Sequence, residues 1–340
     1  MNSSELSNDS RLPVAVIGCG RMGRLHARVY SQIPQVKLVG VYDANLEAAR
    51  TTAAEYGGVG FATVDELLKH AKAVTIATPT VTHLDLATQC ITRGVACLVE
   101  KPLAKDVNEA RQIAALSQKH GVTVQVGHIE RFNPAVRAMS SIDMAPRFME
   151  VVRISPLTFR SIDVGVVLDM MIHDIDIVLN LAGSKVKTVD AVGVAVIGDM
   201  EDICNARLTF ENGCVANLTA SRLALKTERK LRVFSSDAYV AIDYQKKHGI
   251  VVRKGPNMAA VRDAVAQMRR GEIKDLSGLN QDGLVEVEEL EIDEVEPLRA
   301  ELDAFVTAVT MKTKPVVSVE QGLAAVETAE RIVEAIAQAK

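Results

Sequence analysis

The chain has 340 residues, of which 48% are hydrophobic and 24% charged, and its formal net charge is -4. A chain of this length exceeds one comfortable hydrophobic core, so we expect two domains. The mild net charge and the lack of a basic cluster exclude a typical nucleic-acid-binding protein. No apolar run reaches the roughly 20 residues of a membrane span, so we expect neither nucleic acid nor membrane as partner.

Residues 1–11 are polar, and we expect them to form a flexible tail; beyond them the chain alternates short β-branched runs with helical patterns. We expect strands at 12–17, 37–42, 59–61, 73–77, 96–99 and 122–126, and helices at 22–32, 46–56, 64–70, 83–92 and 107–120. Strands that alternate with helices predict parallel pairing through right-handed crossovers, and hence a doubly wound α/β sheet. We expect this first domain to cover 12–127.

From residue 128 the pattern changes, and we expect a second domain at 128–340. We expect helices at 133–141, 164–181, 297–312 and 319–339, and strands at 148–154, 187–196, 204–210, 215–223, 230–234, 238–243, 251–253 and 285–292. The segment 256–283 is polar and less regular, and we expect a surface excursion there. Turn residues between successive strands predict an α+β domain with a large, mainly antiparallel, open-faced sheet.

The run Gly18-Cys19-Gly20-Arg21-Met22-Gly23 follows the first strand and opens the first helix. In this context Gly18 permits a tight turn, Gly20 lets the backbone approach a pyrophosphate, and Gly23 lets the helix pack on the strand. A purely structural glycine turn is the alternative. The strand, the helix and the downstream acid are all in place, so we interpret the turn as the phosphate site of a Rossmann domain.

The downstream acid is Asp43, which follows the second strand at 20 residues beyond Gly23. Its carboxylate can accept hydrogen bonds from a ribose diol and would repel a 2′-phosphate. Ala44 and Asn45 come next, with no cation for such a phosphate. The sequence therefore predicts NAD rather than NADP.

Two further corners follow strands that end at the same edge of the predicted sheet. They are Thr78-Pro79-Thr80 and Glu100-Lys101-Pro102. Open α/β sheets bind ligands at this edge, which favours a functional role for both corners. A solvated strand end remains the alternative for the charged pair.

The helix at 164–181 carries Asp169, His173 and Asp176 at the i, i+4 and i+7 positions of an otherwise apolar segment. Such a stripe either lines a ligand site or forms an internal polar network, because isolated buried polar groups are unfavourable. A neutral imidazole beside a carboxylate suits a general base. The three side chains could also hold a divalent ion, but no His-x-x-x-His or cysteine ligand set is present, and we expect no metal.

Taken together, these motifs resemble the glucose–fructose oxidoreductase / inositol dehydrogenase (Gfo/Idh/MocA) family. The resemblance runs from Leu12 to about Ile336 and includes the segments 297–302 and 315–318. It implies an NAD(P)-dependent sugar or polyol oxidoreductase, and a second-domain sheet through which a homodimer or homotetramer forms.

The resemblance also implies roles for individual residues. Lys101 would bind the reacting hydroxyl, His173 would remove its proton, and Asp169 would hold the sugar. The cofactor would be bound by the residues of the glycine turn and by those around the two corners, namely Gly18, Gly20, Arg21, Met22, Gly23, Asp43, Thr78, Pro79, His83, Glu100, Lys101 and Pro102.

Two segments, 127–134 and 226–234, are similar to family members that oxidise nucleotide sugars at C3, such as UDP-N-acetylglucosamine 3-dehydrogenases and their uronic-acid relatives. We therefore expect Arg131, Asn133 and Arg160 to contact substrate, together with Lys101, Asp169 and His173. Arg222 and Arg229 are weaker candidates for a diphosphate. A free-sugar or inositol-type dehydrogenase and a non-catalytic dinucleotide sensor remain as alternatives, although a sensor has no need of both Lys101 and His173.

Five cysteines occur without a CxxC pair or zinc-type spacing. This usage favours a reducing compartment, and we expect a cytoplasmic protein.

Overall fold

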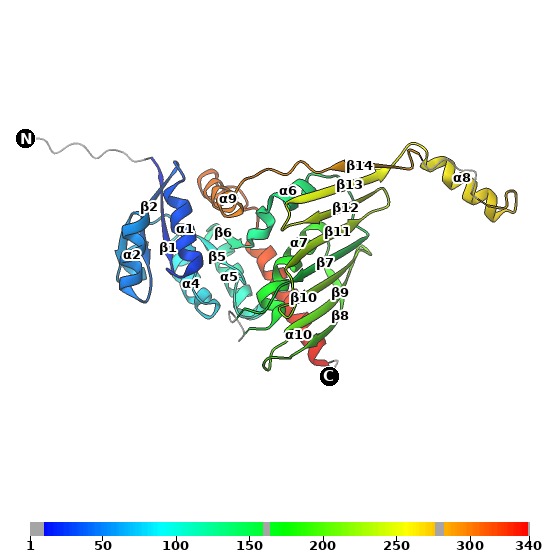
Figure 1. Cartoon of the computed structure of the whole chain (residues 1–340). Coiled ribbons are helices and arrows are strands. Elements are labelled where there is room, and N and C mark those ends of the chain that lie inside the picture. Colours follow the sequence, from blue (N-terminus) through cyan, green and yellow to red (C-terminus); the bar gives the residue numbers. More distant parts are fainter. Residues whose placement is uncertain (1–9, 159–163, 276–281, 339–340) are drawn as a thin grey trace, which may run out of the picture. The chain divides into compact units, whose positions relative to one another are not determined.

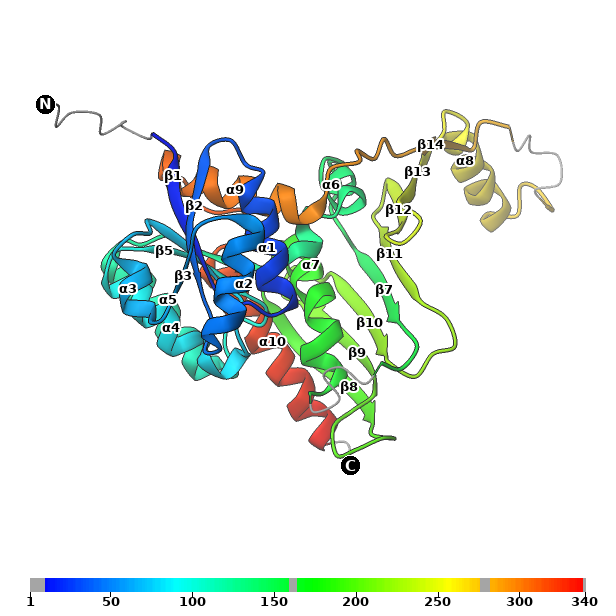
Figure 2. The same ribbon diagram turned by 60° about the vertical axis from the view of Figure 1, so that its left-hand side comes forward.

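The structure is a computed structural model that describes residues 10–158, 164–275 and 282–338. The chain packs as two units (Figures 1 and 2). The first comprises the chain up to Phe132 together with Val295–Arg331, and the second comprises Asn133–Glu294 and the chain from Ile332 onward. The sequence suggested one division near residue 127, whereas Val295–Arg331 returns to the first unit.

The first unit contains a six-stranded sheet in the order β3-β2-β1-β4-β5-β6. Every neighbouring pair is parallel. The strands are β1 (Leu12–Ile17), β2 (Val36–Tyr42), β3 (Val59–Phe61), β4 (Ala73–Ile76), β5 (Ala96–Glu100) and β6 (Val124–Gly127). This order and pairing confirm the doubly wound Rossmann-type sheet.

The crossover helices of this unit are α1 (Arg21–Ser31), α2 (Leu46–Tyr56), α3 (Val64–Leu68), α4 (His83–Thr92) and α5 (Val107–His120). Side-chain caps begin α2 at Asn45 and α5 at Asp106, and Gly121 ends α5 in the left-handed conformation that glycine favours. Two short 3-10 turns, η1 (Thr80–Thr82) and η2 (Ile129–Phe132), were not predicted.

Helix α9 (Pro297–Met311) joins the core of the first unit. Its buried side chains Leu298, Leu302, Phe305 and Val306 belong to the same apolar cluster as residues of β1, β2 and α1. An amphipathic helix buries its apolar stripe wherever a complementary surface exists, whatever its place in the sequence. Helix α10 (Val319–Gln338) follows, and its last residues pack in the second unit.

The second unit is built on an eight-stranded sheet in the order β14-β13-β12-β11-β7-β10-β9-β8. The strands are β7 (Phe148–Ile154), β8 (Val186–Val194), β9 (Ile203–Phe210), β10 (Val215–Ser221), β11 (Glu228–Phe234), β12 (Ala238–Asp243), β13 (His248–Lys254) and β14 (Val285–Glu289). The β7–β10 pair is parallel and the other pairs are antiparallel, so the predicted mainly antiparallel sheet is confirmed.

Burial alternates along the strands of this sheet. In β7, Met149, Val151 and Arg153 are buried, whereas Phe148 and Glu150 on the opposite face are partly exposed. Helix α7 (Ile172–Ala182) contacts β7 and β10, and α6 (Pro134–Ser140) contacts β12. The side chains of the other face are partly or fully exposed, as in an open-faced sheet.

Two expectations for this unit were wrong in detail. The helix expected at 164–181 begins with the π-helical segment Val167–Met171 and becomes α-helical only at α7. The excursion at 256–283 contains the helix α8 (Met258–Arg269), which Figure 1 shows beyond the ends of β13 and β14. Its alanine-rich sequence favours a helix. Among the residues of α8, however, only Ala264 is buried, so the sequence lacks the periodic apolar pattern by which a packed helix is predicted.

Candidate active site

The glycine turn joins β1 to α1 with the geometry that a dinucleotide phosphate site requires. Gly18 has a φ of 98°, and a Cβ on Gly23 would lie 1.7 Å from the Gly18 carbonyl oxygen, so neither position tolerates a side chain. A Cβ on Gly20 would meet no described atom within 4 Å. The turn is therefore closed on the protein side and open at Gly20, where a pyrophosphate fits.

The first turn of α1 adds a positive electrostatic potential to this place. Gly20 is the N-cap residue, and no side chain of the described residues caps the helix. The N–H groups of a first helical turn have no intrahelical acceptor, and the helix dipole favours an anion there. The residues present thus fit the phosphate part of NAD.

Asp43 is held against the turn by two backbone hydrogen bonds. Its Oδ2 accepts from the Cys19 N–H at 2.7 Å and its Oδ1 accepts from the Asn45 N–H at 2.8 Å. Each carboxylate oxygen keeps acceptor capacity beyond these bonds, so the oriented group can also bind a ribose diol. The carboxylate also adds negative charge beside the turn, which would disfavour the additional phosphate of NADP.

The corners after β4 and β5 are linked through His83. Its Nδ1 lies 3.0 Å from the Pro102 carbonyl oxygen, and its Nε2 lies 3.0 Å from that of Thr78. The Lys101–Pro102 peptide bond is cis. Burial lowers the pKa of His83, and the hydrogen bonds to these carbonyls oppose that shift. A neutral ring donates to one of the two carbonyls, and a protonated ring donates to both. His83 is buried and braces the two corners.

Glu100 is the last residue of β5, and its side chain turns back toward the backbone of Lys101. Its Oε2 accepts from the Lys101 N–H at 3.3 Å, and its Oε1 lies 2.9 Å from His26 Nε2. Burial alone would raise the pKa of Glu100, but the His26 hydrogen bond and the charges of His26 and Lys101 outweigh it, and the pKa lies below its usual value. Glu100 is therefore an ionised anchor for this corner.

In the second unit, Asp169 lies in the π-helical segment and His173 in the first turn of α7. Both side chains are partly exposed, whereas Asp176 is buried. The predicted stripe therefore has two members accessible to a ligand and one in the interior.

Glu201 holds the start of this helical region. Its carbonyl oxygen accepts from the Val166 N–H at 2.9 Å, and its Oε1 accepts from the Val167 N–H at 3.1 Å. A Cβ on Gly165 would lie 2.1 Å from Glu201 Oε1, so glycine is required for this approach. Glu201 thus satisfies backbone groups that helix geometry leaves without partners, just before Asp169.

Next to His173, Asp174 forms a buried ion pair with Arg153. Its two oxygens accept from Arg153 Nε and Nη2 at 2.7 and 2.8 Å, and Arg153 lies 5.9 Å from the Tyr244 ring centroid. A bidentate buried pair fixes orientation strongly. It anchors the first turn of α7 to the sheet and thereby holds the backbone of His173 in place.

The remaining predicted residues are distributed over both units. Arg131 is largely buried in η2 of the first unit. Asn133 begins the second unit as the N-cap of α6, with its Oδ1 accepting from the Ala135 N–H at 3.0 Å. Arg160 lies outside the described residues. Arg222 is buried, with Nε 3.6 Å from Asp202 Oδ1 and a hydrogen bond to the Val164 carbonyl, which explains its burial without a ligand.

Two buried residues near Glu100 were not predicted. His26 lies in α1 and Glu301 in α9, and ligand-type atoms of His26, Glu100 and Glu301 lie within 4.8 Å of one another. A charged residue inside an apolar helical face was the available signal for both. Because His26 already donates to Glu100, we assign no metal to this cluster.

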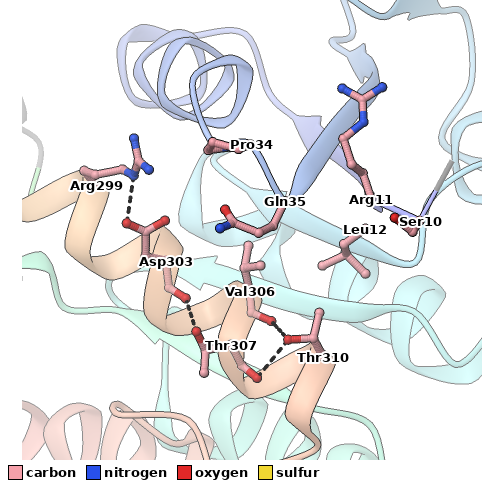
Figure 3. Close-up of a pocket in the computed structure, with 10 residues that line it drawn as sticks. All are labelled: Ser10, Arg11, Leu12, Pro34, Gln35, Arg299, Asp303, Val306, Thr307 and Thr310. Carbon is pink, nitrogen blue, oxygen red and sulfur yellow. Dashed lines mark hydrogen bonds and ion pairs between the residues drawn. The ribbon is translucent and has the colours of Figure 1, made fainter.

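A hollow of about 670 Å³ lies elsewhere in the first unit (Figure 3). It is lined by Ser10, Arg11, Leu12, Pro34, Gln35, Arg299, Asp303, Val306, Thr307 and Thr310. Leu12 is the first residue of β1, so the hollow is at the amino ends of the strands and not at the cofactor edge. The polar side chains that α9 contributes to the hollow bind partners on the same helix. Arg299, for example, donates to Asp303 at 2.7 Å.

Comparison with known proteins agrees with this geometry. Residues 12–128 match the model of the oxidoreductase family with an NAD-binding Rossmann fold (GFO_IDH_MocA), and residues 153–241 match the GFO/IDH/MocA C-terminal domain. A UDP-N-acetylglucosamine 3-dehydrogenase of Acidithiobacillus ferrooxidans is 39% identical over 75% of this chain and 82% of its own length. The chain belongs to the Gfo/Idh/MocA oxidoreductase family.

Two further matches show which kinds of enzyme this Gfo/Idh/MocA protein resembles. The solved structure of UDP-N-acetylglucosamine 3-dehydrogenase GnnA from Acidithiobacillus ferrooxidans superposes with a TM-score of 0.85 at 33% identity, covering 96% of this chain and 97% of that one. An inositol 2-dehydrogenase of Rhizobium meliloti is 29% identical over 71% of this chain and 78% of its own length. The predicted family, two-domain fold, enzyme class and NAD-binding domain are confirmed. Along the described ranges, no helix has the length and apolarity to cross a membrane.

The glycine geometry makes a prediction for two variants. Gly20→Ala should fold with wild-type thermal stability and bind NAD at least tenfold more weakly, because its Cβ enters the space of the pyrophosphate and not that of the protein. Gly23→Ala should lower both stability and affinity, since its Cβ meets the Gly18 carbonyl. Thermal melts and calorimetric titration with NAD measure the two effects. Wild-type NAD affinity in Gly20→Ala would contradict the placement of the phosphates.

Proposed function

We propose that this protein is an NAD-dependent dehydrogenase that oxidises a secondary ring hydroxyl of a nucleotide sugar, namely C3 of a UDP-N-acetylhexosamine. The observation that carries the proposal is the similarity to UDP-N-acetylglucosamine 3-dehydrogenase over nearly the whole of both chains. A match of this extent includes both the cofactor unit and the unit with Asp169 and His173.

In this proposal the first unit binds NAD and the second binds the sugar and mediates assembly. The glycine turn, including the Arg21 and Met22 backbone, cradles the pyrophosphate, and Asp43 binds the adenosine ribose. Thr78, Pro79 and Pro102 line the nicotinamide end, with His83 and Glu100 behind them. The carboxylate of Asp43 favours NAD over NADP.

The chemical step removes a hydride and a proton from one alcohol. Lys101 donates a hydrogen bond to the reacting hydroxyl, His173 accepts its proton, and Asp169 orients the sugar. Bound NAD supplies the hydride acceptor at nicotinamide C4. With the hydride taken up by that acceptor, the alcohol would become a ketone and its hydroxyl proton would be held by His173.

Substrate contacts are proposed at Arg131, Asn133 and Arg160. An arginine suits a diphosphate because its planar guanidinium makes paired hydrogen bonds to oxyanions. Arg222 is a poorer candidate, since Asp202 offsets its charge.

A second candidate is an inositol-type dehydrogenase, which the similarity to inositol 2-dehydrogenase favours. NADH formation compared between UDP-N-acetylglucosamine and myo-inositol separates the two. A nucleotide-sugar enzyme should favour the first substrate in kcat/KM, whereas preference for inositol would support the second candidate.

Replacement of His173 tests the mechanism. His173→Asn should reduce turnover by about 10²- to 10⁴-fold, the usual contribution of a general base, while NAD affinity stays at the wild-type level. His248→Asn is the matched control, because His248 is an exposed histidine of the same unit. Steady-state NADH formation and NAD titration provide the measurement. Wild-type turnover in His173→Asn would remove the proposed base.

We also propose that the protein forms a homodimer or homotetramer through the exposed face of the eight-stranded sheet. Phe148, Phe234 and Tyr239 make a ring cluster on this face, with centroid distances of 5.7 and 4.7 Å. Beside it, Arg232 pairs with Glu150 at 2.9 Å. Apolar rings bordered by charges are typical of a subunit interface.

Light scattering during size-exclusion chromatography tests this assembly. The wild type should elute as a dimer or tetramer, and Phe234→Glu should shift it to the monomer by placing a charge within the ring cluster. Val59→Glu, at an exposed position of the first unit, is the control and should leave the mass unchanged. A monomeric wild type, or an unchanged mass for Phe234→Glu, would disprove the interface.

A cytoplasmic location is part of the same proposal. All five cysteines are free and buried. Free thiols without disulfides suit a reducing compartment.

A further inference from the structure

Glu301 is a fully buried acid in the middle of α9, and the nearby residues Leu298, Leu302 and Phe305 of the same helix belong to the apolar core of the first unit. Among the described residues, neither of its carboxylate oxygens has a hydrogen-bond partner. An ionised carboxylate in such a place is strongly unfavourable, whereas the protonated acid is much less so. The first question is therefore what charge Glu301 carries.

The surroundings of Glu301 include an acid that is already ionised. Oxygen or nitrogen atoms of His26, Glu100 and Glu301 lie within 4.8 Å of one another. Burial first, and the negative charge of Glu100 second, raise the pKa of Glu301 well above its usual value. The pKa of Glu100 is shifted in the opposite direction, so of the two acids Glu100 is the one that burial and its neighbours favour as the ionised group.

The groups of α1 that pack near Glu301 have hydrogen-bond partners other than Glu301. On α1, His26 donates to Glu100, and Tyr30 hydroxyl lies 3.0 Å from Thr75 Oγ1, which is in turn 3.2 Å from His26 Nδ1. Burial raises the pKa of Tyr30, so this phenol stays neutral.

Two more elements bring charged residues to this side of α9. The 3-10 turn η2 contacts α9 and contains Glu130 and Arg131, yet Glu100 is the charge that shifts Glu301. On α9 itself, Arg299 and Asp303 pair with each other at the surface. In the described part of the chain, His26 and Arg299 are thus engaged with other acids, Glu100 and Asp303 respectively.

We propose that Glu301 carries a proton in the working enzyme and acts as a positioning residue for Lys101. Ligand-type atoms of Glu301 and Glu100 lie within 4.8 Å of each other, so a protonated Glu301 carboxyl can turn its O–H toward the ionised Glu100. Glu100 Oε2 in turn accepts from the Lys101 N–H. Through Glu100, Glu301 would thus hold the Glu100-Lys101-Pro102 corner in place. The two acids would then present a single negative charge near the Lys101 amine. The role for Lys101 rests on the proposed function, whereas the protonation of Glu301 does not.

The protonation state has a measurable effect on stability. A group whose folded-state pKa is raised contributes stability that is fully present below its unfolded pKa and is lost as pH rises toward the folded pKa. For Glu301 this window begins near the ordinary value of 4.5 and extends upward. Glu301→Gln keeps the shape of the neutral acid without the titration.

The test compares urea unfolding of the full wild-type chain, Glu301→Gln and Glu301→Ala from pH 5 to 9. The folding constant of Glu301→Gln relative to wild type should rise with pH, by up to about tenfold per pH unit. Asp303→Asn, on the same helix but at the surface, should show no such rise. A Glu301→Gln protein that is less stable than wild type at every pH would overturn the inference, because it would mean an ionised, paired Glu301.

Two further measurements test the protonation of Glu301 without relying on the Glu301→Gln variant alone. If Glu301→Gln does not fold, the infrared spectrum of wild type should show a protonated carboxyl band at neutral pH that disappears on unfolding, and its absence would contradict the proposal. Elemental analysis of the wild type should find no stoichiometric divalent ion. A stoichiometric ion that is lost in Glu301→Gln would show instead that His26, Glu100 and Glu301 form a metal site.

Activity tests the positioning role separately. Turnover of wild type should fall at alkaline pH as Glu301 ionises, Glu301→Gln should retain turnover there, and NAD affinity should be equal in both. Glu301→Ala should lose turnover at all pH values, because the donor to Glu100 is gone. If no sugar is oxidised, the proposed function fails while the stability result stands; if sugar is oxidised but the pH profiles of wild type and Glu301→Gln coincide, the positioning role fails.

Discussion

Four parallel strands of the first unit, β1, β2, β4 and β5, end at one edge of their sheet. Hydrogen bonds at this edge tie the segments that follow them: the Cys19 N–H donates to Asp43, and His83 spans the carbonyls of Thr78 and Pro102. Because each strand is fixed by its neighbours, four segments distant in sequence meet with little freedom. The cofactor site depends on this shared edge more than on any one residue.

Buried charges hold the functional segments in both units. Asp174 and Arg153 anchor the start of α7, and Glu201 caps the π-helical segment before it. In the first unit, Glu100 supports the Lys101 backbone. Buried polar groups are unfavourable unless satisfied, so each network defines one arrangement of the chain beside Lys101 or His173, the residues proposed to act in catalysis. Rigid placement of this kind is what proton and hydride transfer require.

The sequence was most informative where function depends on local spacing. Gly18, Gly20, Gly23 and Asp43 have fixed separations because one turn and one strand connect them, and the structure gives each the expected conformation or hydrogen bond. The strands were predictable because they are short runs of apolar residues, or of alternating apolar and polar residues, bounded by turns. The exposed helix α8 was missed because it buries almost nothing.

Features that depend on distant contacts could not be predicted. The π-helical segment depends on Glu201, more than 30 residues further along the chain, and the return of α9 to the first unit depends on the core that receives it. Glu301 was visible only as an acid in an apolar helix, and its proximity to Glu100 required the fold. Arg160 stays a prediction, and so do the roles of Lys101, Asp169 and His173.

The central claim, oxidation at C3 of a UDP-linked sugar, is tested most directly by isotope transfer. UDP-N-acetylglucosamine carrying deuterium at C3 should be incubated with the enzyme and NAD, and the nicotinamide product analysed by mass spectrometry. The account predicts NADH that contains one deuterium atom, because the hydride comes from C3. Unlabelled NADH, or the absence of reduction while myo-inositol is oxidised, would contradict it.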